Sequence, residues 1–231
     1  MKVILTGGLL IALATGCSPR ESADARPADQ STAAVATAPQ ASSALPTATG
    51  KEAIRYVTAE AGNAARYRIR EQLVGVDLPN DAIGETKGVS GVIAADAKGK
   101  ILADGSKFII DVSTLQSDKQ RRDGFVRGRV LQTQQYPTVT FVPTAVRGIS
   151  LPLPKSGGKT FDMIGDLTVR GTTRPTTWKV NAQFAPSALT GHATTAFTFA
   201  DFGIDQPRVP VVLSVADTIK LELDFSMIPK K

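Results

Sequence analysis

The sequence has 231 residues, of which 42% are hydrophobic and 21% are charged, with one cysteine, one histidine and a formal net charge of +6. This composition suits a globular chain with one sizeable core, and it excludes a disulfide framework and a zinc site built on several histidines. The positive excess is not concentrated in the N-terminal part, so it does not by itself indicate nucleic-acid binding.

The first 17 residues have the pattern of a secretory signal. A lysine follows the initiator methionine, and Val3–Ala14 is an apolar run too short to span a bilayer. Leu13–Cys17 resembles a bacterial lipobox, after which Cys17 is lipidated and becomes the mature N-terminus. Conventional cleavage stays open, because Ala14 stands where a larger aliphatic residue is usual. The pattern predicts a lipoprotein-type signal peptide and a membrane-anchored protein of the bacterial cell envelope, in the periplasm.

Residues 18–50 consist mainly of Ala, Ser, Thr, Pro and Gln, and they contain no aromatic residue. Such a segment cannot bury enough apolar surface to offset the entropy lost on ordering. We therefore expect a disordered linker at 18–50, followed by one folded domain at 51–231.

Alternating apolar and polar residues predict strands through most of this domain. Each such run has one apolar face, and closure into a barrel removes the exposed edges of the sheet, which favours a barrel over a sandwich. The apolar members, in chain order, are Ala65, Tyr67 and Ile69; Val89, Gly91 and Ile93; Phe108, Ile110 and Val112; Val139 and Phe141; Thr195, Phe197 and Phe199; and Ile219, Leu221, Leu223 and Phe225.

The clearest of these patterns is a hairpin at Gly165–Phe184. Leu167 and Val169 alternate with polar residues before a break at Gly171–Pro175, which is rich in Gly, Pro and Thr. After the break the alternation resumes on an apolar face formed by Trp178, Val180, Ala182 and Phe184.

One short helix interrupts the strands. Ser117 and Gln120 have the spacing of a capping box, and Gly128 is a typical stop. Phe125 and Val126 are expected on its inward face. Its charged residues have the i, i+4 spacing of ion pairs, Asp118 with Arg122 and Asp123 with Arg127.

Residues that could carry catalysis are scarce. His192 is the single histidine and is expected on the barrel surface or rim, and Cys17 belongs to the processed segment. The sequence therefore predicts neither an enzyme nor a metal site. Several acidic residues fall at strand ends and turns, where capping and turn contacts explain them: Asp111, Asp123, Asp166 and Asp201.

The chain contains, in order, the short motifs Asp111–Leu115, Arg122-Asp123, Leu131–Thr133, Tyr136–Phe141, Gly165–Pro175 and Asp201–Ile204. Together this series resembles the YceI family of periplasmic polyisoprenoid-binding proteins. The resemblance covers about residues 55–228 and implies an all-β fold, an eight-stranded antiparallel lipocalin-like β-barrel with one or two short helices around an apolar tunnel. The chain departs from the family pattern at Phe125 and at 131–133, near one tunnel mouth.

The resemblance implies that the barrel binds an isoprenoid or similar long apolar lipid, such as a quinone tail, as an envelope carrier or reservoir. No other cofactor is expected; the partners are this lipid and the membrane, and a homodimer stays open. Tyr67 or Trp178 is expected to orient a head group. The alternative is a structural or stress-related interaction protein, with a filled barrel and a partner bound to its loops. The candidate ligand-binding residues are Tyr67, Ile69, Phe108, Ile110, Phe141, Leu167, Val169, Trp178, Val180, Phe184, Phe197, Phe199, Ile219, Leu221 and Leu223.

Overall fold

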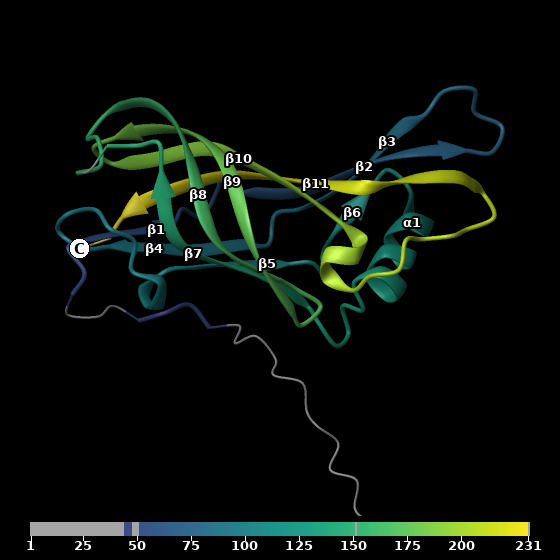
Figure 1. Ribbon diagram of the computed structural model, residues 1–231, viewed down its shortest axis with the longest axis horizontal. Helices are drawn as coiled ribbons and strands as arrows, with labels where there is room; N and C mark the ends of the chain where they lie inside the picture. Colours follow the sequence, from purple (N-terminus) through teal and green to yellow (C-terminus); the bar gives the residue numbers. More distant parts are fainter. Residues whose placement is uncertain (1–43, 48–50, 151, 231) are drawn as a thin grey trace, which may run out of the picture. The chain divides into compact units, whose positions relative to one another are not determined.

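The computed structural model describes residues 44–47, 51–150 and 152–230 (Figure 1). The helices and strands, in chain order, are β1 (Ile54–Thr58), β2 (Ala64–Leu73), β3 (Asn80–Thr86), β4 (Val89–Ala95), η1 (Ala103–Gly105), β5 (Lys107–Asp111), β6 (Gln116–Ser117), α1 (Gln120–Phe125), η2 (Val126–Val130), β7 (Thr138–Arg147), β8 (Gly157–Val169), β9 (Thr172–Ala185), β10 (Ala188–Thr198), η3 (Phe199–Phe202) and β11 (Val212–Pro229).

The predicted signal peptide and most of the predicted linker lie outside the described residues. Within 44–47, the Pro46 carbonyl accepts a hydrogen bond of 2.6 Å from Nη2 of Arg55, a residue of β1. No helix in the described part of the chain has the length and apolar character needed to cross a membrane.

The described strands form one antiparallel sheet that closes on itself. Eight of them make a ring in the order β1-β4-β5-β7-β8-β9-β10-β11, and β1 pairs with β11, with Val57 opposite Ile228. The other three strands, β2, β3 and β6, are separated from β1, β4 and β5 respectively by short breaks in the chain. They pair in the order β11-β2-β3-β6 and lengthen the barrel at one end. The predicted eight-stranded antiparallel barrel is therefore confirmed.

The predicted hairpin is β8 and β9, joined by a turn of two residues. Val169 is paired with Thr172, and both turn residues have positive φ, 48° at Arg170 and 74° at Gly171. This is the left-handed conformation that a tight hairpin needs. The predicted break at Gly171–Pro175 is therefore too long.

Most of that predicted break belongs to β9, including its proline. Pro175 pairs with Asp166 of β8, whereas the pairing of β9 with β10 reaches only as far as Lys179. At Pro175, therefore, the edge of β9 that faces away from β8 has no partner strand in the described part of the chain. A residue without an N–H is tolerated at such an edge.

The short helix is α1, continued as one π-helical turn, η2. The predicted capping box is wrong, because the N-cap is Lys119 and makes no side-chain capping bond. Ser117 instead donates to Oδ1 of Asp123 from its N–H at 2.8 Å and from its hydroxyl at 2.6 Å. The predicted stop at Gly128 is also wrong, because η2 runs on to Val130.

One of the two predicted ion pairs on this helix is present. Arg122 contacts Asp118 at 2.5 Å, as expected. Asp123 is buried against Ser117, and Arg127 donates to the carbonyl of Leu115 at 2.6 Å. The predicted Asp123–Arg127 pair is therefore absent.

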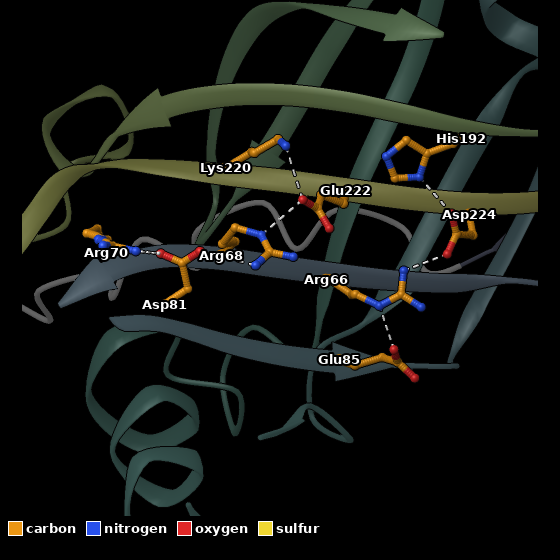
Figure 2. A network of polar contacts seen from close by, with 9 residues as sticks. All are labelled: Arg66, Arg68, Arg70, Asp81, Glu85, His192, Lys220, Glu222 and Asp224. Carbon is orange, nitrogen blue, oxygen red and sulfur yellow. Dashed lines mark hydrogen bonds and ion pairs between the residues drawn. The ribbon is translucent and has the colours of Figure 1, made fainter. Parts of the chain in front are cut away.

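A ladder of ion pairs covers the outer face of the barrel where β3, β2, β11 and β10 lie side by side (Figure 2). The arginines of β2 alternate with its inward apolar residues, so they all point outward. His192, expected on the surface, is part of this ladder. The contacts are Arg66 with Glu85 (2.6 Å) and Asp224 (2.5 Å), Arg68 with Asp81 (3.2 Å) and Glu222 (3.2 Å), Arg70 with Asp81 (3.2 Å), Lys220 with Glu222 (3.2 Å) and His192 with Asp224 (2.7 Å).

Candidate ligand-binding cavity

The inside of the barrel is hollow. Side chains alternate between the two faces of each strand, so the inward apolar residues of successive strands meet around the barrel axis. They surround a cavity of about 710 Å³. A barrel of this strand number can be filled by its own side chains or hold one small ligand, and this one leaves room for a ligand.

All of the predicted ligand-binding residues line this cavity. They come from β2, β5, β7, β8, β9, β10, β11 and the start of η3, and their role in ligand contact stays a prediction. They are Tyr67, Ile69, Phe108, Ile110, Phe141, Leu167, Val169, Trp178, Val180, Phe184, Phe197, Phe199, Ile219, Leu221 and Leu223.

Glycines on the inner face make room for large aromatic side chains of neighbouring strands. Gly84 is paired with Tyr67, and a Cβ at Gly84 would lie 2.2 Å from Cε1 of that ring. The ring therefore occupies the space that a side chain at position 84 would need. Gly91 has the same relationship to Phe108. A Cβ at Gly165 or Gly191 would also come within 2.7 Å of the ring of Phe141 or 2.6 Å of that of Phe225, but a backbone carbonyl oxygen would be nearer still.

The wall also includes residues that the sequence pattern missed. The inner face of β3 carries Ala82, Gly84 and Thr86, all buried. Such small residues give no apolar alternation, so β3 was not predicted as a strand. From β8, Phe161 and Met163 also line the cavity, upstream of the point where the predicted hairpin began.

Two polar atoms of the cavity wall have no hydrogen-bond partner among the described residues, the hydroxyl of Tyr67 and Nε1 of Trp178. Burial raises the pKa of Tyr67 to about 12, against an opposing effect of the nearby Arg122. The hydroxyl therefore stays protonated at neutral pH. Both groups can donate a hydrogen bond, and neither has an acceptor within the described residues.

A buried ion pair lies in the wall near Tyr67. Glu71 is in phase with Tyr67 and Ile69 on the inner face of β2, and its side chain is 7% exposed. It contacts Nη2 of Arg122, which α1 brings to the wall. The alternation along β2 places Glu71 on the inner face, so the sequence contains a sign of this polar group in the wall. The spacing of residues does not identify its partner in α1.

The described residues contain no group of three or more His, Cys, Asp or Glu side chains that could hold a metal ion. Two of the four acidic residues singled out in the sequence make local contacts of the predicted kind. Asp111 accepts from the N–H of Ser113 at 2.9 Å, and Asp201 accepts from the N–H of Thr198 at 2.7 Å. The prediction is wrong for Asp123, which lies buried inside α1 and accepts from Ser117 of β6.

A closed antiparallel barrel around an apolar cavity defines the chain as a lipocalin-like barrel. The family comparison is more specific, since residues 56–227 match the model of the YceI-like domain. The chain therefore belongs to the YceI family, as the sequence motifs predicted.

Relatives of known sequence include UPF0312 proteins of Pseudomonas. The protein of Pseudomonas putida (strain GB-1) is 32% identical over 133 residues, which are 54% of this chain and 62% of the relative. That of Pseudomonas fluorescens (strain SBW25) is 32% identical over 135 residues, 54% of this chain and 64% of the relative. The match thus spans less than two thirds of either relative.

Solved structures share the fold at low sequence identity. A polyisoprenoid binding domain from Saccharophagus degradans, implicated in plant cell wall breakdown, has a TM-score of 0.56 at 12% identity and covers 76% of this chain and 98% of its own. BcnA from Burkholderia cenocepacia has a TM-score of 0.53 at 19% identity and covers 71% of this chain and 95% of its own.

Proposed function

We propose that this protein binds an isoprenoid or a similar long apolar lipid inside the barrel and serves as a carrier or reservoir in the bacterial cell envelope. The observation that carries the proposal is the cavity of about 710 Å³, whose wall is formed by the apolar faces of the barrel strands. The protein of the same fold from Saccharophagus degradans is a polyisoprenoid binding domain, which supports the same class of ligand. The cavity counts against the alternative of a barrel filled by its own side chains.

The size and chemistry of the cavity suit such a ligand. Its volume lies within the range of roughly 300–1,000 Å³ that small-molecule sites occupy. Burial of about ten methylene groups contributes roughly 8 kcal/mol, at ~0.8 kcal/mol each. Immobilising the chain of the ligand costs part of this, which leaves micromolar affinity or better.

The N-terminal pattern supports a place in the envelope. A signal ending at Cys17 would put the domain outside the cytoplasm, and lipidation of Cys17 would hold it at a membrane that contains its ligand. A linker at 18–50 would then let the barrel move relative to the anchor.

Mass spectrometry of an organic-solvent extract tests the proposal. The full chain is purified from a bacterial host that makes isoprenoid lipids, and the extract is compared with that of an unrelated protein purified in the same way. We expect an isoprenoid that is enriched in the first extract and near one molecule per chain. Recovery of none, together with no uptake of added polyprenol or ubiquinone, would contradict the proposal.

Two substitutions on β10 show whether that lipid sits inside the barrel. Ala193 lines the cavity and is 5% exposed, whereas Ala196 of the same strand is exposed on the outside. Ala193→Phe should reduce the recovered lipid strongly, and Ala196→Phe should leave it unchanged. Equal recovery from both variants, with folding checked by circular dichroism, would place the lipid elsewhere.

A further inference from the structure

Five large apolar side chains are exposed at one end of the barrel. Among the described residues, seven large hydrophobic side chains are exposed, and five of these lie in the β2–β3 connection or at the start of β11. We call these five the apolar tip. Its members are Val74 (56% exposed), Val76 (44%), Leu78 (74%), Val211 (64%) and Leu213 (66%).

The two segments of the apolar tip are held together by the sheet. Leu73 is paired with Val212, and the N–H of Val74 donates to the carbonyl of Val211 at 3.1 Å. Figure 1 shows the β2–β3 connection and the loop that leads into β11 at the same end of the barrel, opposite β1. The exposed residues therefore form one patch rather than scattered positions. Such patches mark contact sites with membranes or proteins.

The apolar tip is continuous with the cavity. Val74, Val76 and Val211 are exposed and also line the cavity, whereas Leu78 and Leu213 are exposed and do not line it. The tip is therefore the rim of the cavity mouth. A rim that is apolar on its inner and its outer side is the surface expected where an apolar ligand passes between the barrel and an apolar phase.

Basic residues at the start of α1 stand at the same mouth. Lys119 and Arg121 line the cavity and are exposed, and Arg121 has no ion pair among the described residues. Acidic residues are present as well, since Asp77 lies in the β2–β3 connection and Asp118 contacts Lys119 at 3.8 Å. Exposed apolar side chains beside Lys and Arg are the combination that binds at a bilayer interface.

We infer that the apolar tip inserts into the interfacial layer of a lipid bilayer, with the cavity mouth against the membrane, so that the ligand enters without crossing water. This inference rests on the proposed function, because it takes the cavity to hold a membrane lipid. A second copy of the chain would also bury the tip, but it would close the mouth instead of supplying a ligand.

Tryptophan fluorescence reports insertion at a single position. The chain has one tryptophan, Trp178, inside the barrel. In a full-length chain carrying Trp178→Phe and Cys17→Ser, which removes the acyl site, Leu78→Trp places the reporter on the tip. The matched control is Ile228→Trp, an exposed apolar position of β11 paired with Val57 at the other end of the barrel.

The probe is a vesicle of phosphatidylethanolamine and phosphatidylglycerol with brominated acyl chains, which quench tryptophan on contact. We expect the Leu78→Trp variant to lose most of its emission and to shift to the blue, with no change in the Ile228→Trp variant. Absence of quenching at position 78, or equal quenching at both positions, would overturn the inference.

A charge substitution tests whether the tip is the route of the ligand. Leu78 and Leu213 do not line the cavity, so Leu78→Asp with Leu213→Asp leaves its wall intact. We expect vesicle binding and the rate of isoprenoid transfer from vesicles to fall about tenfold or more. Uptake of the same isoprenoid from detergent solution should not change.

The outcomes separate this inference from the proposed function. Uptake from detergent with unchanged transfer from vesicles would overturn the inference and leave the proposed function standing. A failure of the unsubstituted chain to take up isoprenoid from detergent would overturn the proposed function, and with it the role of the tip as an entry port. A dimer that the two aspartates dissociate would assign the tip to a second copy and overturn the inference.

Discussion

The ring of Phe108 occupies the space that a side chain on Gly91 would need. The two residues are direct partners across β4 and β5, and a Cβ at Gly91 would lie 2.3 Å from Cδ1 of the ring. Real Cβ atoms do not come this close to another heavy atom. Since Phe108 lines the cavity, the glycine lets the ring lie against the sheet instead of projecting into the lumen. The width of the cavity thus depends on a residue that has no side chain.

Gly91→Ala should narrow the cavity. The added methyl group forces the Phe108 ring inward, because the nearest atoms all belong to that ring and the backbone can stay in place. We expect a weaker Kd for a labelled polyprenol, and the further substitution Phe108→Leu should restore affinity by removing ring volume. Gly124→Ala is the control, since nothing lies within 4 Å of its added Cβ. Unchanged affinity in Gly91→Ala would contradict this account of the cavity width.

Tyr67→Phe should weaken binding only of ligands that carry a hydrogen-bond acceptor. The hydroxyl is buried and has no partner among the described residues, so the free protein loses no hydrogen bond in the substitution. A ligand that pairs with the hydroxyl would lose about 1 kcal/mol of binding free energy.

Titration calorimetry with a matched pair of ligands measures this difference. A quinone or prenol should bind severalfold more weakly to the Tyr67→Phe variant, and the hydrocarbon of the same chain length should bind equally to both proteins. A parallel loss for both ligands would show that the hydroxyl acts through the structure of the wall.

Breaking the buried pair of Glu71 and Arg122 should destabilise the fold. Arg122→Met leaves the Glu71 carboxylate in the wall without its cation, and its side chain is only 7% exposed. The expected loss of unfolding free energy is ~3 kcal/mol, at the lower end of the range for breaking a buried pair. Removing both charges, with Glu71→Leu added, should recover most of that loss.

Urea denaturation measures these differences, and a neighbouring arginine supplies the control. Arg121 is exposed and forms no ion pair among the described residues, so Arg121→Met should change the unfolding free energy by less than ~0.5 kcal/mol. If the two methionine variants were equally stable, the pair would not contribute to the fold.

The barrel could be predicted because most of its strands carry bulky apolar residues at every second position. The strand β3 escaped because its inner face carries Ala82, Gly84 and Thr86, and the space above Gly84 is filled by Tyr67 of the neighbouring strand. The reason for these small residues lies in a partner strand, where a local pattern cannot reach it. The capping box failed for a local reason, because Ser117 of β6 bonds to the side chain of Asp123 inside α1 instead of capping the helix.

The sequence pattern alone does not decide whether the barrel encloses a cavity. Alternation places Ile69, Phe141 and Leu223 on the inner face, but the same alternation describes a filled core. Whether the interior stays hollow depends on closure of the ring and on the glycines beneath the aromatic rings. Closure and the placing of the glycines depend on which strands pair, and the sequence of a single strand does not give this pairing.

The outer ladder of ion pairs should make stability depend on acid pH. Burial by itself would raise the pKa of Asp224, but hydrogen bonds from Arg66 and His192 outweigh this effect and lower the pKa below its ordinary value of 3.8. The pKa of Glu222 is lowered below 4.5 in the same way, since contacts with Arg68 and Lys220 outweigh the effect of burial. Both carboxylates thus favour the folded state only while they are ionised.

The stabilisation by ionised Asp224 is complete above pH 3.8, the ordinary pKa of the group. It is lost as the pH falls below that value and through the lowered pKa of the folded state. Arg66→Gln removes one of its partners, so this variant should be less stable at neutral pH by under about 1 kcal/mol, since the pair is partly exposed. The difference between variant and parent should shrink below pH 3.8. Thermal denaturation across this range measures it, with Arg208→Gln, an exposed arginine without an ion pair among the described residues, as the control. A difference that stayed constant with pH would mean that Arg66 stabilises the barrel by packing rather than by its charge.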